Sequence, residues 1–254
     1  MTNSDSASAF TAMHKRGNPL VLYNIWDAGS ACAVVRAGAT AVATGSASVA
    51  AAHGYDDGEA LPLAELKATI ERITAAVTVP ISVDMESGYG ESPGTVGQTA
   101  VVLAAAGAVG CNFEDQRIAR GGVFSIATQC DRLAGIRTAL ADANLPMHIN
   151  ARTDVFLQQP DQTQHRDLLP AAIDRAKAYA EAGADSFFAP WLADIGLIET
   201  LCESVPLPVN IMWRDGVAAI ADLARAGVAR VSYGPGPYRQ VIAGLEAAAA
   251  AVYR

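Results

Sequence analysis

Short apolar runs rich in β-branched residues alternate with longer alanine-rich or amphipathic stretches from residue 19 to the end of the chain. The short runs are typical of strands buried on both faces, and the longer stretches have the length of helices. Eight strands are expected, over residues 19–24, 40–44, 80–83, 107–113, 146–151, 184–189, 208–212 and 229–233. Helices are expected over residues 9–15, 29–37, 63–77, 94–106, 131–143, 171–182, 196–204, 217–226 and 237–253.

Alternate helices end in a shared glycine signal. Ala-Gly-Ala or Ala-Gly-Val precedes the second, fourth, sixth and eighth expected strands, as befits helices that end in a left-handed glycine. Eight strand–helix units favour a (β/α)8 TIM-type barrel over a doubly wound sheet, which has about five or six strands at this length. We expect a single barrel domain over residues 1–254, with residues 1–8 as a polar, flexible tail.

Composition narrows the class of protein. At 51% hydrophobic and 17% charged residues, the chain has ample material for a core. Its formal net charge of −8, without a long basic run, makes nucleic acid and anionic membrane surfaces poor partners. No apolar run approaches the roughly 20 residues of a membrane span, and the N-terminus lacks a basic-then-apolar secretion signal. Four scattered cysteines favour reduced thiols in a cytoplasmic protein.

Polar residues gather where the expected strands end, which in such barrels is the face that carries the chemistry. Asp84 and Glu86 follow the third strand, and Glu114 ends the fourth. Side chains two apart on a strand share a face, so these acids can converge. Oxygen-only, carboxylate-rich sites suit Mg²⁺ or Mn²⁺, with water completing the octahedron. The alternative is a structural pairing of buried carboxylates with an arginine, for which Arg152 at the end of the fifth strand is available.

Donors for an anion lie near these acids. The planar guanidinium of Arg152 suits a substrate carboxylate or phosphonate. The turn at residues 44–46, with Ala47, offers backbone N–H groups to a second anionic oxygen, and Asn210 on the seventh strand adds an amide. A metal, an arginine and an amide turn in one pocket predict a site for a small 2-oxo acid, with the ion stabilising an enolate.

Histidines are not expected to carry the chemistry. His148 is expected as a hydrogen-bonded group inside the barrel, and His14 is expected to face solvent. His53 lies on a loop near the expected site.

The lysines and the turn after the eighth expected strand bear on two other kinds of barrel chemistry. An imine-forming aldolase is set aside because the only lysines (Lys15, Lys67 and Lys177) fall in expected helices, away from strand ends. The turn at residues 232–236 leaves a phosphate-binding barrel open, although a packing role at the barrel end is the favoured interpretation.

The ordered strand-end motifs resemble those of the isocitrate lyase/phosphoenolpyruvate mutase superfamily. The motifs are Asp84-Met-Glu-Ser-Gly-Tyr-Gly90, Asn112-Phe-Glu-Asp115, Ala151-Arg-Thr-Asp154 and Ser232-Tyr-Gly-Pro235. The resemblance runs from about residue 20 to the C-terminus and implies a modified (β/α)8 barrel. It also implies dependence on Mg²⁺ and a homo-oligomer, a tetramer or dimer, whose last helix is exchanged between subunits. Family members break or form C–C or P–C bonds beside a 2-oxo acid through an enolpyruvate-like anion.

The resemblance assigns roles by position. The residues that match the family's metal-site acids, several of which reach the ion through water, are Asp84, Glu86 and Glu114. Arg152 matches the substrate-binding arginine, and Asp57 an aspartate near the reacting centre of mutase members. Gly45 and Ser46 fall on the family's Ser-Gly substrate turn with the order reversed.

The loop after the fourth strand departs from the family. Lyases carry Lys-Lys-Cys-Gly-His there, with the cysteine as acid/base, whereas this chain reads Arg117-Ile-Ala-Arg-Gly-Gly-Val-Phe124. Gly122 falls where the cysteine, or the asparagine of mutases, would lie, and Cys130 is expected at the start of the next helix. Cleavage of isocitrate or methylisocitrate is therefore not expected.

The leading hypothesis is a Mg²⁺-dependent lyase-like enzyme on a small 2-oxo or 2-hydroxy acid, acting by C–C cleavage or decarboxylation. The second is P–C bond chemistry on phosphonopyruvate, by a mutase or hydrolase. The third is a 2-oxo acid-binding protein that kept the metal site and lost catalysis with its loop acid.

Overall fold

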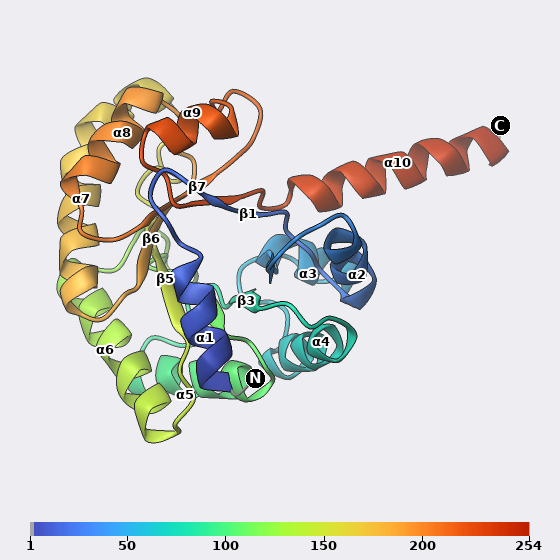
Figure 1. Ribbon diagram of the computed structural model, residues 1–254, viewed down its shortest axis with the longest axis horizontal. Coiled ribbons are helices and arrows are strands. Elements are labelled where there is room, and N and C mark those ends of the chain that lie inside the picture. The colour runs from blue at the N-terminus through green and yellow to red at the C-terminus, as the bar shows by residue number, and fades with distance from the viewer. Residues whose placement is uncertain (1–2, 254) are drawn as a thin grey trace.

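Eight parallel strands form a nearly closed barrel in the computed structural model, which describes residues 3–253 (Figure 1). The strands are β1 (Leu20–Leu22), β2 (Val42–Ala43), β3 (Ile81–Asp84), β4 (Gly110–Glu114), β5 (His148–Arg152), β6 (Ser186–Ala189), β7 (Val209–Met212) and β8 (Arg230–Ser232). They pair in the order β1-β8-β7-β6-β5-β4-β3-β2. Between β1 and β2 a single bridge, from Ile25 to Thr44, joins the chain just beyond the strands. The (β/α)8 TIM-type prediction is confirmed.

Helices α2 to α9 lie between the strands in the chain and surround the barrel, whereas α1 precedes β1 and α10 follows β8 (Figure 1). They are α1 (Asn3–Ala12), α2 (Ala28–Arg36), α3 (Ser46–Ala52), α4 (Leu63–Ala76), α5 (Pro93–Ala105), α6 (Ile126–Asp142), the short 3₁₀ helix η1 (Gln162–Gln164), α7 (His165–Glu181), α8 (Ile195–Ser204), α9 (Ile220–Arg225) and α10 (Gly236–Tyr253). α10, in red, projects away from the barrel. Among the described residues, no helix is long and apolar enough to cross a membrane.

The local sequence explains most helix boundaries. Ser92 and Asp194 cap α5 and α8 by accepting hydrogen bonds from the backbone N–H groups of the first turn. The four glycines expected to end helices all have left-handed backbones, with φ of 104° at Gly38, 107° at Gly107, 103° at Gly183 and 86° at Gly227. Only a residue without Cβ adopts this conformation readily, so each helix stops where the next strand must begin.

Several helices differ from the sequence-based expectation. Residues 3–8, expected as a polar tail, belong to α1, because Ala7 and Phe10 on one face of that helix are buried against the barrel; residues 1 and 2 lie outside the described residues. α3 replaces part of an expected loop, and its residues Ser48, Val49 and Ala50 are buried. α6 begins earlier because Ser125 accepts a hydrogen bond from the N–H of Thr128, and α7 begins earlier although Pro170 lies inside it.

The interior end of α1 closes the bottom of the barrel. Phe10 is fully buried and meets the ring of His148, at the start of β5, edge to face with 5.5 Å between centroids. His14 stacks on His148 at 4.1 Å and bonds through Nδ1 to the carbonyl of Phe10. The expectation that His14 faces solvent is wrong, because the chain just beyond α1 places its side chain against His148, with 7% of the residue exposed. The expectation for His148 is confirmed, since its ring bonds to Ser186 and Thr11.

This pair of buried histidines predicts a stability loss in acid. Burial lowers the pKa of His14 to about 3, with Arg230 adding to the effect, and burial also holds the pKa of His148 well below its usual value. In the unfolded chain both titrate near about 6.5. As pH falls from there toward about 4, the unfolded state takes up protons that the folded state refuses, so stability falls.

His14→Phe should remove one of these protonations while keeping the ring. We expect the variant to lose about 2–3 kcal/mol less free energy of unfolding than the wild type between pH 7 and pH 4.5. Urea unfolding at the two pH values measures this difference. An equal loss in both proteins would contradict the role of His14.

Candidate active site

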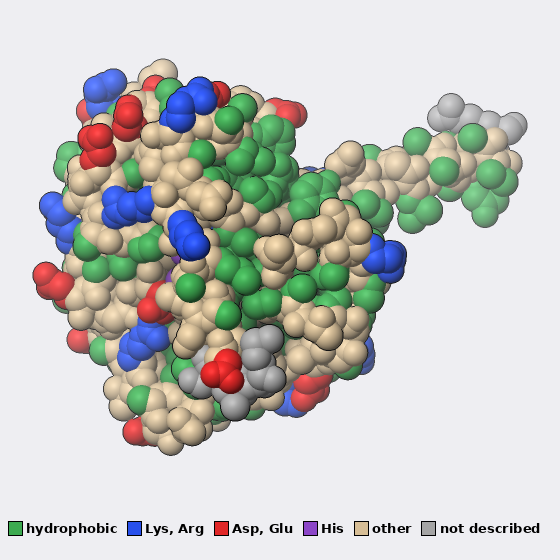
Figure 2. Space-filling model, viewed as in Figure 1, with side chains coloured by type: hydrophobic (Ala, Val, Ile, Leu, Met, Phe, Trp, Pro, Cys, Tyr) green, Lys and Arg blue, Asp and Glu red, His purple; other side chains and the backbone are tan. Residues whose placement is uncertain are grey.

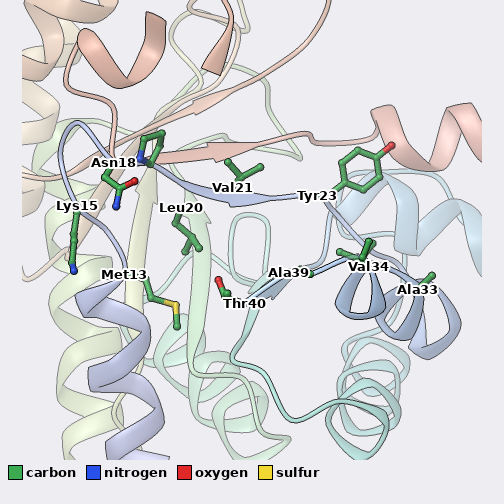
Figure 3. Close-up of a pocket in the computed structure, with 13 residues that line it drawn as sticks. Met13, Lys15, Asn18, Leu20, Val21, Tyr23, Ala33, Val34, Ala39 and Thr40 are labelled. Atoms are coloured by element: carbon green, nitrogen blue, oxygen red, sulfur yellow. The ribbon is translucent and has the colours of Figure 1, made fainter. Parts of the chain in front are cut away.

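A cavity of about 320 Å³ opens at the carboxyl ends of the strands. The expected site residues among those lining it are Gly45, Ser46, Ala47, Asp57, Asp84 and Arg152. Side chains of Glu86 and Glu114 lie beside it, and no lysine of the chain is among its lining residues. A larger hollow of about 730 Å³, beside β1 and α2, lies away from the strand ends and contains no acidic side chain (Figure 3). The strand-end cavity is therefore the candidate active site.

Asp84 ends β3, and of the three acids expected at a metal site it is the one that lines the cavity. Its Oδ2 accepts a hydrogen bond of 3.3 Å from the N–H of Ser46, and its own N–H donates to the hydroxyl of Thr44 at 2.9 Å. Burial raises the pKa of Asp84, and the nearby charge of Arg152 partly opposes that rise. The carboxylate is thus held next to the turn at residues 44–46 by an N–H group of that turn.

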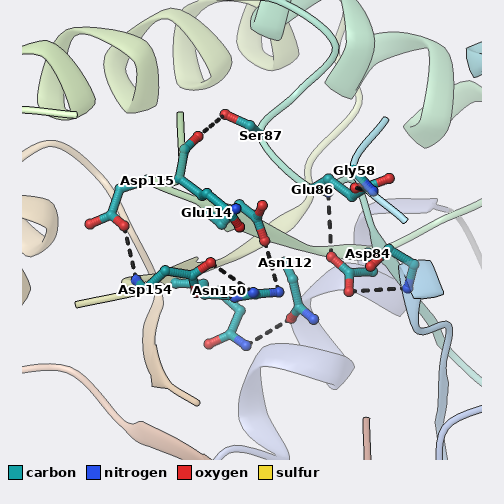
Figure 4. A network of polar contacts seen from close by, with 12 residues as sticks. Gly58, Asp84, Glu86, Ser87, Asn112, Glu114, Asp115, Asn150 and Asp154 are labelled. Carbon is teal, nitrogen blue, oxygen red and sulfur yellow. Dashed lines mark hydrogen bonds and ion pairs between the residues drawn. The ribbon is translucent and has the colours of Figure 1, made fainter. Parts of the chain in front are cut away.

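Glu86 lies just beyond β3, where a left-handed backbone, φ 50°, turns its side chain toward a neighbouring loop. Its Oε2 accepts hydrogen bonds from the N–H groups of Gly58 at 2.9 Å and Glu59 at 2.8 Å (Figure 4). Glu59 in return accepts a bond of 2.7 Å from the N–H of Tyr89. This reciprocal clasp holds the loop that carries Asp57. Burial, then Asp84 and Asp57, raise the pKa of Glu86 to about 8.

Glu114 and Asp154 pair with Arg152 at the ends of β4 and β5 (Figure 4). One Nη of Arg152 lies 2.7 Å from Glu114, while its Nε and other Nη meet the two oxygens of Asp154 at 2.6 and 2.8 Å. Burial would lower the pKa of Arg152, but the two carboxylates raise it well above its ordinary value. Burial raises the pKa of Glu114 well above its ordinary value, and Arg152 opposes this rise. The structural pairing considered for Arg152 is present.

Arg152 keeps N–H groups that its contacts with Glu114 and Asp154 do not use. A guanidinium has five N–H bonds, and these contacts use three of them. The side chain also lines the cavity, so it can receive a further anion there. Structural pairing and substrate binding are thus compatible in one residue.

The donor set suits a hard divalent cation, although the acids do not form a ready-made cage. Within residues 3–253, no three His, Cys, Asp or Glu side chains come close enough to hold an ion jointly. Asp84, Glu86 and Glu114 nevertheless act on one another electrostatically, since Asp84 and Glu86 each help to raise the pKa of Glu114. Buried oxygen donors with excess negative charge are the environment that Mg²⁺ prefers, with water in the remaining positions.

Other expected candidates lie elsewhere. Asn210 is buried inside the barrel, where its side chain exchanges hydrogen bonds with Ser232, and it is absent from the cavity lining. Cys130 lies on α6 with its Sγ 3.5 Å from the carbonyl of Ala178 on α7. His53 bonds to the carbonyl of Val49 and to Thr69. Neither of these side chains is available to the cavity.

Asn24, which the sequence did not single out, closes the seam between β1 and β2. Its Oδ1 accepts hydrogen bonds from the N–H groups of Tyr233 at 2.8 Å and Gly234 at 2.9 Å, and its Nδ2 donates to the carbonyl of Thr44 at 2.9 Å. Both of these amides in the turn after β8 are therefore engaged. This contact supports the packing role of the turn over a phosphate-binding one.

Part of the cavity lining is apolar. The hydrophobic periodicity of the sequence did not predict which apolar residues would line the cavity. These residues follow β5, β6 and β7, or end those strands: Leu157, Phe188, Pro190, Trp191 and Met212. A run of large apolar residues after a strand was the available signal. Phe188 pairs in register with Arg152, whose guanidinium lies 6.0 Å from the centre of its ring, so apolar and charged groups meet in one cavity.

A family model and a curated relative both match most of this chain. The sequence matches the family model described as phosphoenolpyruvate phosphomutase over residues 10–253. It is 30% identical over 217 residues to 2-methylisocitrate lyase of Escherichia coli (strain K12), covering 82% of this chain and 70% of that one.

Solved structures agree with the sequence match. The crystal structure of a Burkholderia cenocepacia J2315 protein, provisionally described as a phosphonomutase, is 45% identical and has a TM-score of 0.93 over 96% of this chain and 97% of that one. A phosphonopyruvate hydrolase in complex with oxalate and Mg²⁺ shares the fold, with a TM-score of 0.84 at 20% identity over 100% of this chain and 88% of that one.

The clasp made by Glu86 predicts local loosening when it is removed. Glu86→Ala leaves two backbone N–H groups without their acceptor, at a cost of about 1–3 kcal/mol for each that stays buried. Amide hydrogen exchange across residues 54–62, measured without metal, should become at least about tenfold faster. Glu91→Ala, which removes an exposed acid 3.9 Å from Arg120, is the control and should leave this segment unchanged. Unaltered exchange in Glu86→Ala would rule out the clasp.

Proposed function

Because this chain belongs to the isocitrate lyase/phosphoenolpyruvate mutase superfamily, whose lyases and mutases act on small carboxylic acids, we propose a specific reaction within it. The proposed enzyme depends on Mg²⁺ and cleaves a C–C bond of a small 2-oxo or 2-hydroxy acid, or decarboxylates it. The observation that carries this proposal is the cavity that Asp84 and Arg152 both line at the strand ends. It offers a ligand for a cation and a donor for a carboxylate in one space.

Asp84 is assigned as the direct metal ligand because it alone of the three expected acids lines the cavity. Glu86 and Glu114 are assigned to ion-bound water, since both are already engaged by loop amides or by Arg152. When bound, Mg²⁺ (or Mn²⁺) supplies stabilisation of negative charge on the 2-oxygen of the substrate.

Arg152 is assigned to the substrate carboxylate. Glu114 and Asp154 fix the plane of its guanidinium, and two N–H bonds remain for the ligand. The turn of Gly45, Ser46 and Ala47 borders the same space and supports the other end of the anion.

Asp57 is assigned to proton transfer. Among the described side chains that line the cavity, the ionisable ones are Asp57, Asp84, Arg152 and Arg239. Asp84 is given to the cation and arginines stay charged, so Asp57 is the group that can exchange a proton. In cleavage of a 2-hydroxy acid, the carboxylate of Asp57 would take the hydroxyl proton as the C–C bond breaks and return it to the carbon of the enolate. In decarboxylation of a 2-oxo acid, water would supply that proton through Asp57.

The apolar part of the cavity lining points to substrates with a short hydrophobic substituent. A tricarboxylate would place a further anion beside Phe188 and Trp191, where burial of a charge is costly unless it reaches Arg239 at the rim. A second candidate, P–C bond chemistry on phosphonopyruvate, draws support from Arg239 at the rim and from the similarity to the Burkholderia structure. Asp57, which matches the mutase aspartate, would serve either reaction.

A substrate panel with Mg²⁺ tests the proposal. We expect pyruvate or another 2-oxo acid to be released from oxaloacetate or an alkyl-substituted malate, and slower or no turnover of 2-methylisocitrate. Asp57→Asn should lower kcat by about 10²–10⁴-fold while oxalate and Mg²⁺ still bind. Cys130→Ser, which alters the downstream cysteine, is the control and should keep wild-type activity.

The panel also separates the alternatives. Turnover of phosphonopyruvate alone would favour P–C chemistry. Tight binding of oxalate without turnover of any acid would favour the binding protein. Full activity in Asp57→Asn would exclude its proton-transfer role.

The projecting helix α10 supports a homo-oligomer, a tetramer or dimer with this helix exchanged between subunits. Its large apolar side chains are exposed, including Leu245 at 64% and Val252 at 79%, and they lie along the arm visible in Figure 2. The hollow beside β1 and α2 is lined by apolar side chains such as Leu20 and Val34 (Figure 3). Exposed apolar faces of this kind are typical of interfaces.

Leu245→Asp should weaken this assembly. Placing a charge on the exposed apolar face of α10 opposes its burial against a neighbour, so we expect a shift toward monomer in sedimentation velocity. Leu245→Met keeps the apolar surface and is the matched control. A monomeric wild type, or an unshifted Leu245→Asp variant, would refute the exchange.

A further inference from the structure

We propose that Asn112 is a substrate-binding residue whose amide N–H₂ donates to a carboxylate or enolate oxygen of the bound acid. Arg230 and Asn150 are positioning residues that fix the direction of that amide. This inference rests on the proposed function, because it names a further contact in the same cavity.

Asn112 lines the strand-end cavity. It lies on β4, in register with Asp84 on β3 and Asn150 on β5. Its side chain is buried, with 4% of the residue exposed, and it lines the cavity together with Asp84 and Arg152. A carboxylic acid bound between Asp84 and Arg152 would therefore lie next to the Asn112 amide.

The orientation of the Asn112 amide is determined by its partners. Its Oδ1 accepts one hydrogen bond of 2.9 Å from Nδ2 of Asn150 and another of 3.1 Å from an Nη of Arg230. Arginine has no acceptor, so the atom that faces it must be the amide oxygen. The amide nitrogen therefore points away from both partners, as Figure 4 shows beside Asn150. In the part of the chain that the structure describes, it has no hydrogen-bond partner.

The hydrogen bonds continue from Asn150 to the bottom of the barrel, and each has a defined donor and acceptor. Oδ1 of Asn150 accepts from the hydroxyl of Ser186 at 2.7 Å, and that hydroxyl lies 2.8 Å from Nε2 of His148. Because Ser186 donates to Asn150, its oxygen is free to accept from Nε2–H, and Nδ1 of His148 then accepts from the hydroxyl of Thr11 at 3.0 Å. A neutral ring with one N–H satisfies this order, and burial keeps the pKa of His148 low.

Arg230 also strengthens the donor. It is fully buried, and within residues 3–253 no acid lies at ion-pair distance from it, while one of its Nη atoms has no hydrogen-bond partner. A positive charge on the oxygen side of an amide polarises its N–H₂, and low surrounding polarity preserves that effect. The polarised donor suits an anionic oxygen.

An anionic oxygen is the ligand chemistry that this geometry selects. The amide oxygen of Asn112, the atom that binds cations, is already occupied by two donors, so the residue is not a metal ligand. The nitrogen that faces the cavity donates and cannot bind a cation. It therefore complements the proposed ion at Asp84 by contacting the substrate itself.

Oxalate binding in the presence of Mg²⁺ tests this role by titration calorimetry. We expect Asn112→Ala to weaken oxalate by about 10–100-fold, the effect of losing one hydrogen bond to a charged group. Asn112→Asp keeps the shape and can pair with Arg230, but it presents an oxygen to the ligand, so oxalate affinity should fall further. Mg²⁺ binding without oxalate should persist in Asn112→Ala.

Arg230 has a separate signature as a positioning residue. Arg230→Met frees the amide to rotate and should weaken oxalate while leaving Mg²⁺ binding intact, and Arg230→Lys should restore part of the affinity. A purely structural role would instead lower the melting temperature without this partial rescue.

Different results would overturn the proposed function and the role of Asn112. A wild-type protein that binds neither oxalate nor any 2-oxo acid with Mg²⁺ would overturn the proposed function. A wild type that binds oxalate, together with Asn112→Ala and Asn112→Asp variants that bind it equally well, would overturn the role of Asn112 alone.

Discussion

Excess negative charge buried around one arginine constrains the whole active face. Asp84, Glu86, Glu114 and Asp154 lie within reach of Arg152 or of one another, and burial raises the pKa of the first three. A single guanidinium cannot neutralise four carboxylates, so the folded state holds some of them at a cost or in protonated form. The divalent cation of the proposed function would relieve that cost.

The barrel makes this concentration possible because each carboxylate is held by a different element. Asp84 is fixed through Thr44 and Ser46 on the β2 side, Glu114 through Arg152 on the β5 side, and Glu86 through the loop at residues 54–59. Below them, a row of neutral amides and hydroxyls fills the interior, with Arg230 as its single cation among the described residues. Polar groups that are mutually bonded can be buried together, and they fix one arrangement of side chains.

Sequence periodicity predicted the strands, their polar ends and the metal and arginine candidates, because these depend on local patterns and on the shared direction of parallel strands. It did not predict where Glu86 points, since a left-handed turn breaks the two-residue alternation just after β3. Asn24 and Asn112 were visible in the sequence only as polar residues near strand ends. Their contacts with Tyr233 and Arg230 join residues more than 100 positions apart, which no local pattern encodes.

The hairpin after β4 explains why proton transfer must be sought elsewhere. The N–H of Arg117 bonds to the carbonyl of Gly122 at 2.9 Å, and Gln116 bridges Val123, so the loop closes on itself. Gly122 has φ of 76° and carries no side chain to reach the substrate. Asp57 instead lines the cavity from the loop between α3 and α4, where the N–H groups of Gly58 and Glu59 bond to Glu86. In the proposed function this loop supplies the acid that the hairpin after β4 cannot provide, beside Asp84 and Arg152 in the same cavity.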